Sequence, residues 1–187
     1  MKRLLIVLLM ALITVVAFAN EKTTETTTFE EPILITSGGQ SPGALQMMVL
    51  AKTGGFDFEF IKDVEPAKEN IAAFNTIIVV VGASGKGLGA AGIDVDDEIA
   101  RLEELVSLAK AEGKSVIIAQ IEGATRRGPS SDKISDAIAH EAELLLIKKD
   151  ADEDGKFTTI ANENEIEIIH FEKTSDARGV LKDVFNK

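Results

Sequence analysis

The fold of this chain is decided by the stretch Ile77-Ile-Val-Val-Val81, followed by Gly82-Ala-Ser-Gly-Lys-Gly-Leu-Gly-Ala-Ala-Gly92. An uninterrupted run of β-branched residues is typical of a strand buried on both faces of a parallel sheet. The glycines that follow let the backbone come close to a ligand. Open α/β sheets bind small molecules at the carboxyl ends of their strands. The stretch therefore predicts the position of a site.

Strands and helices alternate on either side of this stretch. Strands are expected over 32–36, 56–61, 76–81, 115–121, 144–147 and 165–171, and helices over 41–52, 66–73, 94–112, 131–140, 157–162 and 176–185. In the helix at 41–52, the buried face is expected to carry Leu45, Met48 and Val49. The alternation predicts an α/β fold, a three-layer α/β/α sandwich around a mostly parallel sheet of about six strands. A flavodoxin-like strand order, with the first and third strands adjacent, is favoured, and a Rossmann-like order is the alternative.

The amino-terminal residues indicate export. A basic start, an uncharged apolar run and the small-residue pattern Ala17-Phe-Ala19 predict a signal peptide over 1–19, cleaved after Ala19. The alternative is an uncleaved anchor, but the run is shorter than the roughly 20 residues that a spanning helix needs. Residues 20–31 are rich in Thr and Glu and are expected to form a flexible polar tether. Residues 32–187 then form one domain, secreted or periplasmic and free of the membrane after cleavage.

Composition excludes several classes of function. The net charge of −11 would repel nucleic acid, and the loss of Lys2 and Arg3 with the signal peptide makes it more negative. The chain has no Cys, so disulfides and thiolate zinc sites are excluded. It also has no Trp or Tyr, which disfavours carbohydrate binding and single-stranded nucleic-acid binding. No cofactor is predicted.

Three loops at the carboxyl ends of the predicted strands carry groups suited to a small anion. The first and third loops would supply hydrogen bonds and backbone amides, and Lys86 with two arginines would supply charge. The predicted ligand-binding residues are Ser37, Gly38, Gly39, Gln40, Ser41, Gly82, Ser84, Gly85, Lys86, Gly87, Arg126 and Arg127.

Each of these loops also has a purely structural explanation. The first can be a tight turn with Ser41 as a helix cap. The glycine loop can be a connection that only packs, and the arginines can be solvated or paired. Lys62-Asp63, after the second strand, is interpreted as a solvated strand end.

The glycine loop does not match the common nucleotide motifs. It is not a Walker A loop, because Gly87 stands where Ser or Thr is required. The pattern Gly85-x-Gly87-x-x-Ala90 fits the loose dinucleotide motif, but no helix is expected to open directly after the strand. An exported protein also rarely meets nicotinamide cofactors.

Signals for catalysis are sparse. Ser84 or Ser37 could act as the nucleophile with His170 as base, and Ser130 and His140 could take part in an alternative triad. However, Ser84 lacks the Gly-x-Ser-x-Gly elbow. A lone histidine in a strand is more often structural.

An acidic turn resembles the opening of a calcium loop. Asp150, Asp152 and Asp154, followed by Gly155, copy the first positions of that loop. The twelfth position is Ala161, where a bidentate Glu is required, although Glu163 or Glu165 could substitute for it, so an acidic turn is favoured over a calcium site.

Three segments resemble an uncharacterised family of secreted bacterial proteins, known only as a domain of unknown function. They are Glu31-Pro-Ile-Leu-Ile-Thr-Ser37-Gly-Gly-Gln-Ser41, Val80-Val-Gly-Ala-Ser-Gly-Lys-Gly-Leu-Gly-Ala-Ala-Gly92 and Arg126-Arg-Gly128. The resemblance runs from Glu31 to the carboxyl terminus. It implies export and a single α/β domain, and it supplies no activity or catalytic residues.

Together these observations predict an exported domain that binds a small anionic ligand at the carboxyl ends of the strands. Such a domain could serve as an accessory to a transport system. The alternatives are a serine hydrolase of unknown substrate and a non-catalytic structural or interaction module.

Overall fold

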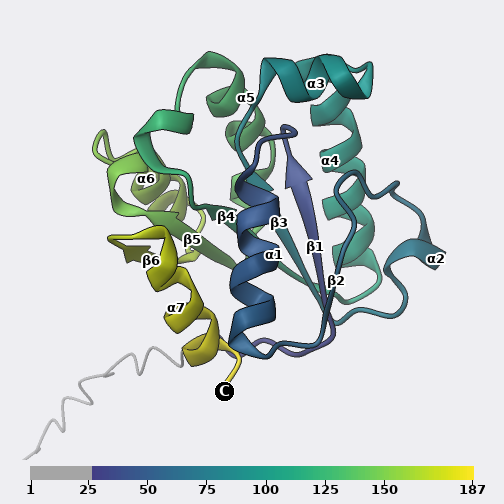
Figure 1. Ribbon diagram of the computed structural model, residues 1–187, viewed down its shortest axis with the longest axis vertical. Helices are drawn as coiled ribbons and strands as arrows, with labels where there is room; N and C mark the ends of the chain where they lie inside the picture. The colour runs from purple at the N-terminus through teal and green to yellow at the C-terminus, as the bar shows by residue number, and fades with distance from the viewer. Residues whose placement is uncertain (1–26) are drawn as a thin grey trace, which may run out of the picture.

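The computed structural model describes residues 27–187, and it has a parallel sheet with helices on both faces (Figure 1). The strands are β1 (Ile33–Gly38), β2 (Phe58–Phe60), β3 (Thr76–Val81), β4 (Ser115–Gln120), β5 (Leu144–Lys148) and β6 (Glu167–Phe171). The α-helices are α1 (Gly43–Gly54), α2 (Lys68–Ile71), α3 (Gly85–Ala91), α4 (Val95–Ala111), α5 (Pro129–Ile138), α6 (Lys156–Glu163) and α7 (Ala177–Val184). The short 3-10 helices are η1 (Gly123–Arg126), η2 (Ala139–Glu141), η3 (Lys149–Ala151) and η4 (Thr174–Asp176). The predicted signal peptide lies outside the described residues.

The strand order is β2-β1-β3-β4-β5-β6, and all neighbouring pairs are parallel. This confirms the flavodoxin-like order, with β1 beside β3. Every residue of β3 is buried, as the β-branched run predicts. Because the strands are parallel, their carboxyl ends form a single edge of the sheet, which we call the rim.

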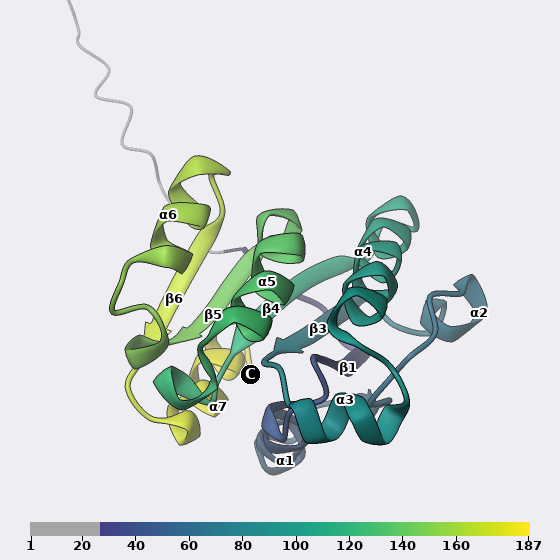
Figure 2. The ribbon, with the colours of Figure 1, turned by 90° about the horizontal axis from the view of Figure 1, so that it is seen from above.

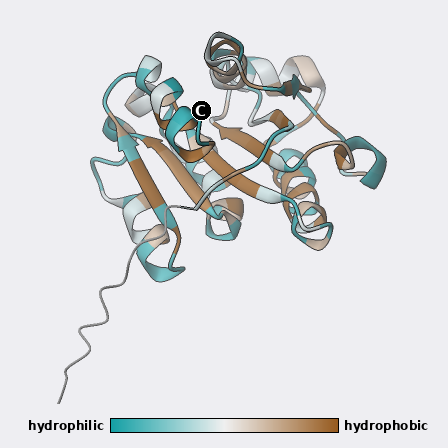
Figure 3. Cartoon of the chain, turned by 90° about the horizontal axis from the view of Figure 1, so that it is seen from below, coloured by the Kyte–Doolittle hydropathy of each residue, from teal (hydrophilic) through white to brown (hydrophobic). Residues whose placement is uncertain are grey.

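Successive residues of each strand point to opposite faces of the sheet and pack into two cores. Helices α4, α5 and α6 cover one face, and α1 and α7 cover the other (Figure 2). The strands are the most apolar part of the cartoon in Figure 3. Within residues 27–187, no helix has the length and apolar character needed to cross a membrane.

Helix α1 turns a different face to the sheet from the one expected. Its buried residues include Gly43, Ala44 and Met47, whereas Leu45 and Val49 are 52% and 49% exposed. The reason is close packing, since a Cβ atom on Gly43 would lie 3.1 Å from Cγ1 of Val80. Small residues let α1 approach the sheet, and this leaves larger apolar side chains outside.

The glycine segment after β3 is a helix, α3, and not the expected loop. Ser84 caps it, because its Oγ accepts a hydrogen bond from the backbone N–H of Gly87 at 3.1 Å. Gly92, in the left-handed conformation, ends it. The helix lies across the rim (Figures 1 and 2), and Leu88 is its only buried residue. Intrinsic helix propensity argues against a helix here, since each interior glycine lowers helix stability by about 1 kcal/mol relative to alanine.

Residues 27–31, which were expected to belong to a flexible tether over 20–31, are part of the folded domain, and residues 20–26 lie outside the described residues. Phe29 is buried, and its backbone N–H donates to the carbonyl of Val184 at 2.9 Å. Its ring also lies 5.9 Å from that of Phe185. One apolar residue in a polar segment was too small a signal to predict this contact with the carboxyl-terminal helix.

Two glycines of α3 should respond oppositely to alanine. A Cβ atom at Gly89 would meet no atom within 4 Å, so Gly89→Ala should raise the free energy of unfolding by about 0.5–1 kcal/mol. A Cβ atom at Gly87 would lie 2.2 Å from the carbonyl oxygen of Gln40, so Gly87→Ala should lower it. Urea unfolding of both variants measures the difference. Equal effects would contradict the packing of α3 on Gln40.

Candidate functional site

The turns that follow β1 and β3 are joined at the rim. The backbone N–H of Gly82 donates to the carbonyl of Gly38, and that of Ser84 donates to the carbonyl of Gly39, both at 2.8 Å. An isolated bridge links Gln40 to Ala83. The predicted residues 37–41 and 82–87 therefore form one continuous structure. Among them, Ser37 and Gly38 are buried inside β1.

Close approach explains why glycine stands at two positions of this joint. Gly39 has φ +114°, and a Cβ atom there would lie 2.5 Å from the carbonyl oxygen of Gly82. A Cβ atom on Gly82 would lie 2.6 Å from Cγ of Arg126. A side chain at Gly39 would push the turns apart, and one at Gly82 would displace the side chain of Arg126.

A buried carboxylate, Glu98 of α4, holds the turn after β1. It accepts hydrogen bonds from the backbone N–H of Gly39 at 2.7 Å and from Nε2 of Gln40 at 3.3 Å. Nε of Arg101 donates to the same carboxylate at 2.9 Å. Buried charge is tolerated where it is paired and hydrogen-bonded in this way.

Arg101 extends this network to two more segments. Its Nη1 donates to the carbonyl of Val64 at 2.8 Å, and its Nη2 donates to the carbonyl of Ser37 at 2.7 Å. Neither Arg101 nor Glu98 was among the site residues predicted from the sequence. A signal was present, because Glu98 lies on the same helical face as the buried Leu102 and Leu105.

Ser41 and Arg126 meet at a second carboxylate, Glu122. The hydroxyl of Ser41 donates to Oε2 of Glu122, and Nε of Arg126 donates to Oε1 at 3.2 Å. Nη1 of Arg126 also donates to the carbonyl of Ala83 at 3.3 Å. Arg126 therefore faces the glycine segment, as the binding hypothesis requires, but the carboxylate of Glu122 partly neutralises its charge.

Arg127 is fully occupied by protein groups. Its five N–H groups donate to the carboxylates of Asp132 and Asp154 and to the carbonyl of Ala151. Its guanidinium also lies over the ring of Phe157, 5.6 Å from the ring centre. Arg127 therefore has no N–H group left to donate to a ligand, and it joins η1, α5 and the acidic turn.

The histidine and the aspartates proposed for catalysis or calcium are used elsewhere. Nε2 of His170 lies 2.8 Å from Oδ2 of Asp152, and no described hydrogen bond joins His170 to a serine. Asp152 also accepts the backbone N–H groups that open α6, including that of Phe157 at 2.6 Å. Asp150 pairs with Lys148, and Asp154 with Arg127. In residues 27–187, no three metal-ligating side chains are close enough to share an ion.

A pocket of about 460 Å³ opens at the rim, between α1, the end of β2 and α3. We call it the rim pocket, and it is lined by Gln40, Ser41, Pro42, Leu45, Phe60, Lys62, Ser84, Lys86, Gly87 and Ala90. Carbon atoms form most of the surface of its wall, and two lysines are among the lining residues. Neither Lys62 nor Lys86 has a salt bridge to a described carboxylate. Lys62, interpreted from sequence as a solvated strand end, is thus part of the wall.

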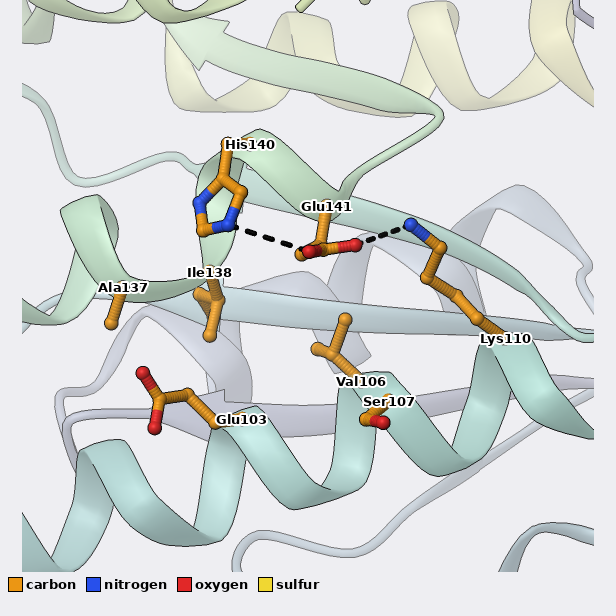
Figure 4. Close-up of a pocket in the computed structure, with 8 residues that line it drawn as sticks. All are labelled: Glu103, Val106, Ser107, Lys110, Ala137, Ile138, His140 and Glu141. Carbon is orange, nitrogen blue, oxygen red and sulfur yellow. Dashed lines mark hydrogen bonds and ion pairs between the residues drawn. The ribbon is translucent and has the colours of Figure 1, made fainter.

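A second pocket, of about 370 Å³, lies between α4 and the end of α5 (Figure 4). Val106 and Ile138 form its apolar floor. Its charged groups are largely paired with one another, because Glu141 accepts from Lys110 and lies 3.4 Å from Nε2 of His140. The rim pocket, with unpaired lysines, is therefore the better candidate site.

Removing the buried carboxylate should destabilise the domain. Glu98→Ala leaves the guanidinium of Arg101, whose side chain is only 11% exposed, without its charge partner, which costs up to about 3–5 kcal/mol. Urea unfolding measures this loss. Glu103→Ala, on an exposed position of the same helix, is the control and should change stability by less than about 0.5 kcal/mol. A loss at Glu98 no larger than that at Glu103 would contradict the anchoring role.

The hydrogen bonds between Arg127 and Asp154 should affect how the stability of the domain depends on pH. Hydrogen bonds from Arg127 lower the pKa of Asp154 to about 2, against about 3.9 in an unfolded chain. A carboxyl whose pKa is lower in the folded than in the unfolded state stabilises the fold at pH values above its unfolded-state pKa. This stabilisation is lost as the pH falls through the folded-state pKa. The Tm difference between the parent and Asp154→Asn should therefore shrink as pH falls from about 4 to about 2.

The change in Tm will be small, because the Asp154 side chain is 58% exposed and water screens the pair. Glu153→Gln, at an exposed neighbouring position, is the control, and its Tm difference should not follow this pattern. A difference for Asp154→Asn that stays constant down to pH 2 would contradict the assignment.

Comparison with solved structures finds distant likeness. The chain is 13% identical to a GDSL-like lipase from Bacteroides thetaiotaomicron, over 74% of this chain and 66% of that one, with a TM-score of 0.37. It is 12% identical to the psychrotrophic esterase EstA of a Pseudoalteromonas species, over 83% of this chain and 95% of that one, with a TM-score of 0.33. These values are too low to support an argument about activity. No curated protein matches the chain.

The family comparison covers most of the folded domain. Residues 30–185 match one family over nearly all of the described chain, from the segment before β1 to the end of α7. The match agrees with the resemblance found in the sequence. The chain belongs to the family described as a domain of unknown function (DUF6305).

Proposed function

We propose that this domain binds a small organic anion with an apolar body in the rim pocket. The observation that carries the proposal is the pairing of an apolar wall with two lysines, Lys62 and Lys86, that no described carboxylate neutralises. In a chain of net charge −11, unpaired lysines at one pocket are a local exception to the overall charge.

The position of the pocket supports a binding role. It is lined by residues that follow β1, β2 and β3, next to the point where the strand order reverses, since the chain runs outward from β1 to β2 and then returns to β3. Ligands of open α/β sheets bind at such switch points, outside the carboxyl ends of the strands. The hydrogen bonds between the two turns fix the part of the wall formed by Gln40 and Ser84.

The chemistry of the wall defines the ligand. Leu45, Phe60 and Pro42 offer apolar contact, and a lysine offers a point charge suited to a carboxylate or a phosphate ester. We infer a carboxylate or phosphate ester that carries a hydrocarbon or aromatic group. Export by an amino-terminal signal would place such a binder outside the cytoplasm, where it could act as an accessory to a transport system.

A serine hydrolase is less well supported by the geometry. Ser84 caps α3, Ser41 donates to Glu122, and His170 bonds to Asp152. The described residues therefore contain no serine and histidine in hydrogen-bond contact, which nucleophilic catalysis would need.

Calorimetric titration with 3-phenylpropanoate tests the proposal. The parent protein should bind it, and the double variant Lys62→Ala/Lys86→Ala should bind about five- to tenfold more weakly, because each exposed ion pair contributes up to about 1 kcal/mol. The parent should bind the neutral analogue 3-phenylpropan-1-ol more weakly than 3-phenylpropanoate by a similar factor.

Lys52→Ala is the matched control, since Lys52 is an exposed lysine in the last turn of α1, far along the helix from the rim. It should bind 3-phenylpropanoate as the parent does. No binding by the parent, or equal binding by the double variant, would overturn the proposal.

A further inference from the structure

Gln40 is the most unusual residue of the rim pocket. It is a non-glycine residue with φ +63°, and it is only 3% exposed although it lines the pocket. Conformations of this kind are uncommon outside glycine and persist where the surroundings fix them, often at functional sites. Here Glu98 and the bridge to Ala83 hold the residue.

One end of the Gln40 amide has no hydrogen-bond partner. Nε2 donates to Oε1 of Glu98 at 3.3 Å, and because a carboxylate only accepts, this contact fixes which end of the amide is the nitrogen. The other end, Oε1, is buried and meets no donor among the described residues. Buried acceptors without a partner are rare in folded proteins and call for an explanation.

Helix α3 packs on the backbone and Cβ of Gln40. A Cβ atom on Gly87 would lie 3.0 Å from Cβ of Gln40, so the helix rests directly on the residue. The helix is held weakly, because Leu88 is its only buried residue and three of its seven residues are glycine. A small outward movement of α3 would open Gln40 further to the rim pocket, which Gln40 lines together with Gly87 and Ala90 of this helix.

We propose that the ligand of the rim pocket is an anion that also carries an O–H or N–H donor, which Oε1 of Gln40 accepts. This rests on the proposed function and narrows it to acids such as hydroxy carboxylates. The lysines hold the anionic group, the apolar wall holds the body of the ligand, and Gln40 selects for the donor. A site built to hydrogen-bond a hydroxyl discriminates strongly against the analogue that lacks it.

Paired ligands test the inference on the unaltered protein. The pairs are 3-phenyllactate with 3-phenylpropanoate, and 2-hydroxy-4-methylpentanoate with 4-methylpentanoate, which differ only in one hydroxyl. Titration calorimetry should give the hydroxy acid of either pair a Kd about tenfold or more lower. Equal Kd values in both pairs would overturn the inference and leave the proposed function standing. Binding of neither member of either pair would overturn both.

Gln40→Met supplies a second measurement. It keeps the size of the side chain and removes the acceptor, so both members of a pair should bind with equal Kd, at the level of the acid that lacks the hydroxyl. A purely structural role for Gln40 would instead weaken both members by the same factor and keep their ratio. The paired titrations on the parent decide the question if this variant does not fold.

The movement of α3 has its own test. Gly89→Ala strengthens the helix without a clash, so stopped-flow association of 3-phenyllactate should slow by about two- to fivefold. An unchanged association rate would overturn α3 as the route by which the ligand reaches Gln40.

Discussion

The buried carboxylate of Glu98 is the interaction on which the rim of the sheet depends. It accepts hydrogen bonds from the backbone N–H of Gly39, the side-chain amide of Gln40 and the guanidinium of Arg101. Arg101 in turn donates to the backbone carbonyls of Ser37 and Val64. One ion pair on α4 therefore sets the geometry of the turn after β1. A carboxylate suits this task, because it accepts several hydrogen bonds at once and its charge strengthens each of them.

The charges of the rim divide into two groups with different roles. Arg101, Arg126 and Arg127 are paired with carboxylates and join the loops to one another. Lys62 and Lys86 are exposed at the wall of the rim pocket and have no described carboxylate partner. This division follows from chemistry, since a planar guanidinium bridges several acceptors, whereas a lysine on a flexible stem is a mobile point charge. The candidate site depends on the lysines, and the scaffold depends on the arginines.

Much of the fold could be predicted from sequence, and the parts that could not have identifiable causes. The central strand, the flavodoxin-like order and most elements follow from hydrophobic periodicity. Helix α3 was missed because glycine opposes helix formation, and here a serine cap and the packing of Leu88 and Gly87 outweigh that preference. The face of α1 was wrong because close packing favoured Gly43 and Ala44 over larger side chains. At the site, Ser84 and Lys86 do line a rim pocket, but Arg127 has no free donor, and no composition or spacing could reveal that.

The sequence by itself determined the layers, the parallel sheet and the edge at which a site would lie, because burial and strand direction are encoded in local patterns of apolar and turn residues. Only the tertiary structure decided which polar groups at that edge remain free. Glu98, Glu122 and Asp154 come from different elements, and each accepts a hydrogen bond from a residue of a distant loop, Gly39, Ser41 and Arg127 respectively. Pairing between residues far apart in the chain has no periodic signature in the sequence. Which polar groups are paired within the protein and which remain available to a ligand is therefore decided only when the chain has folded.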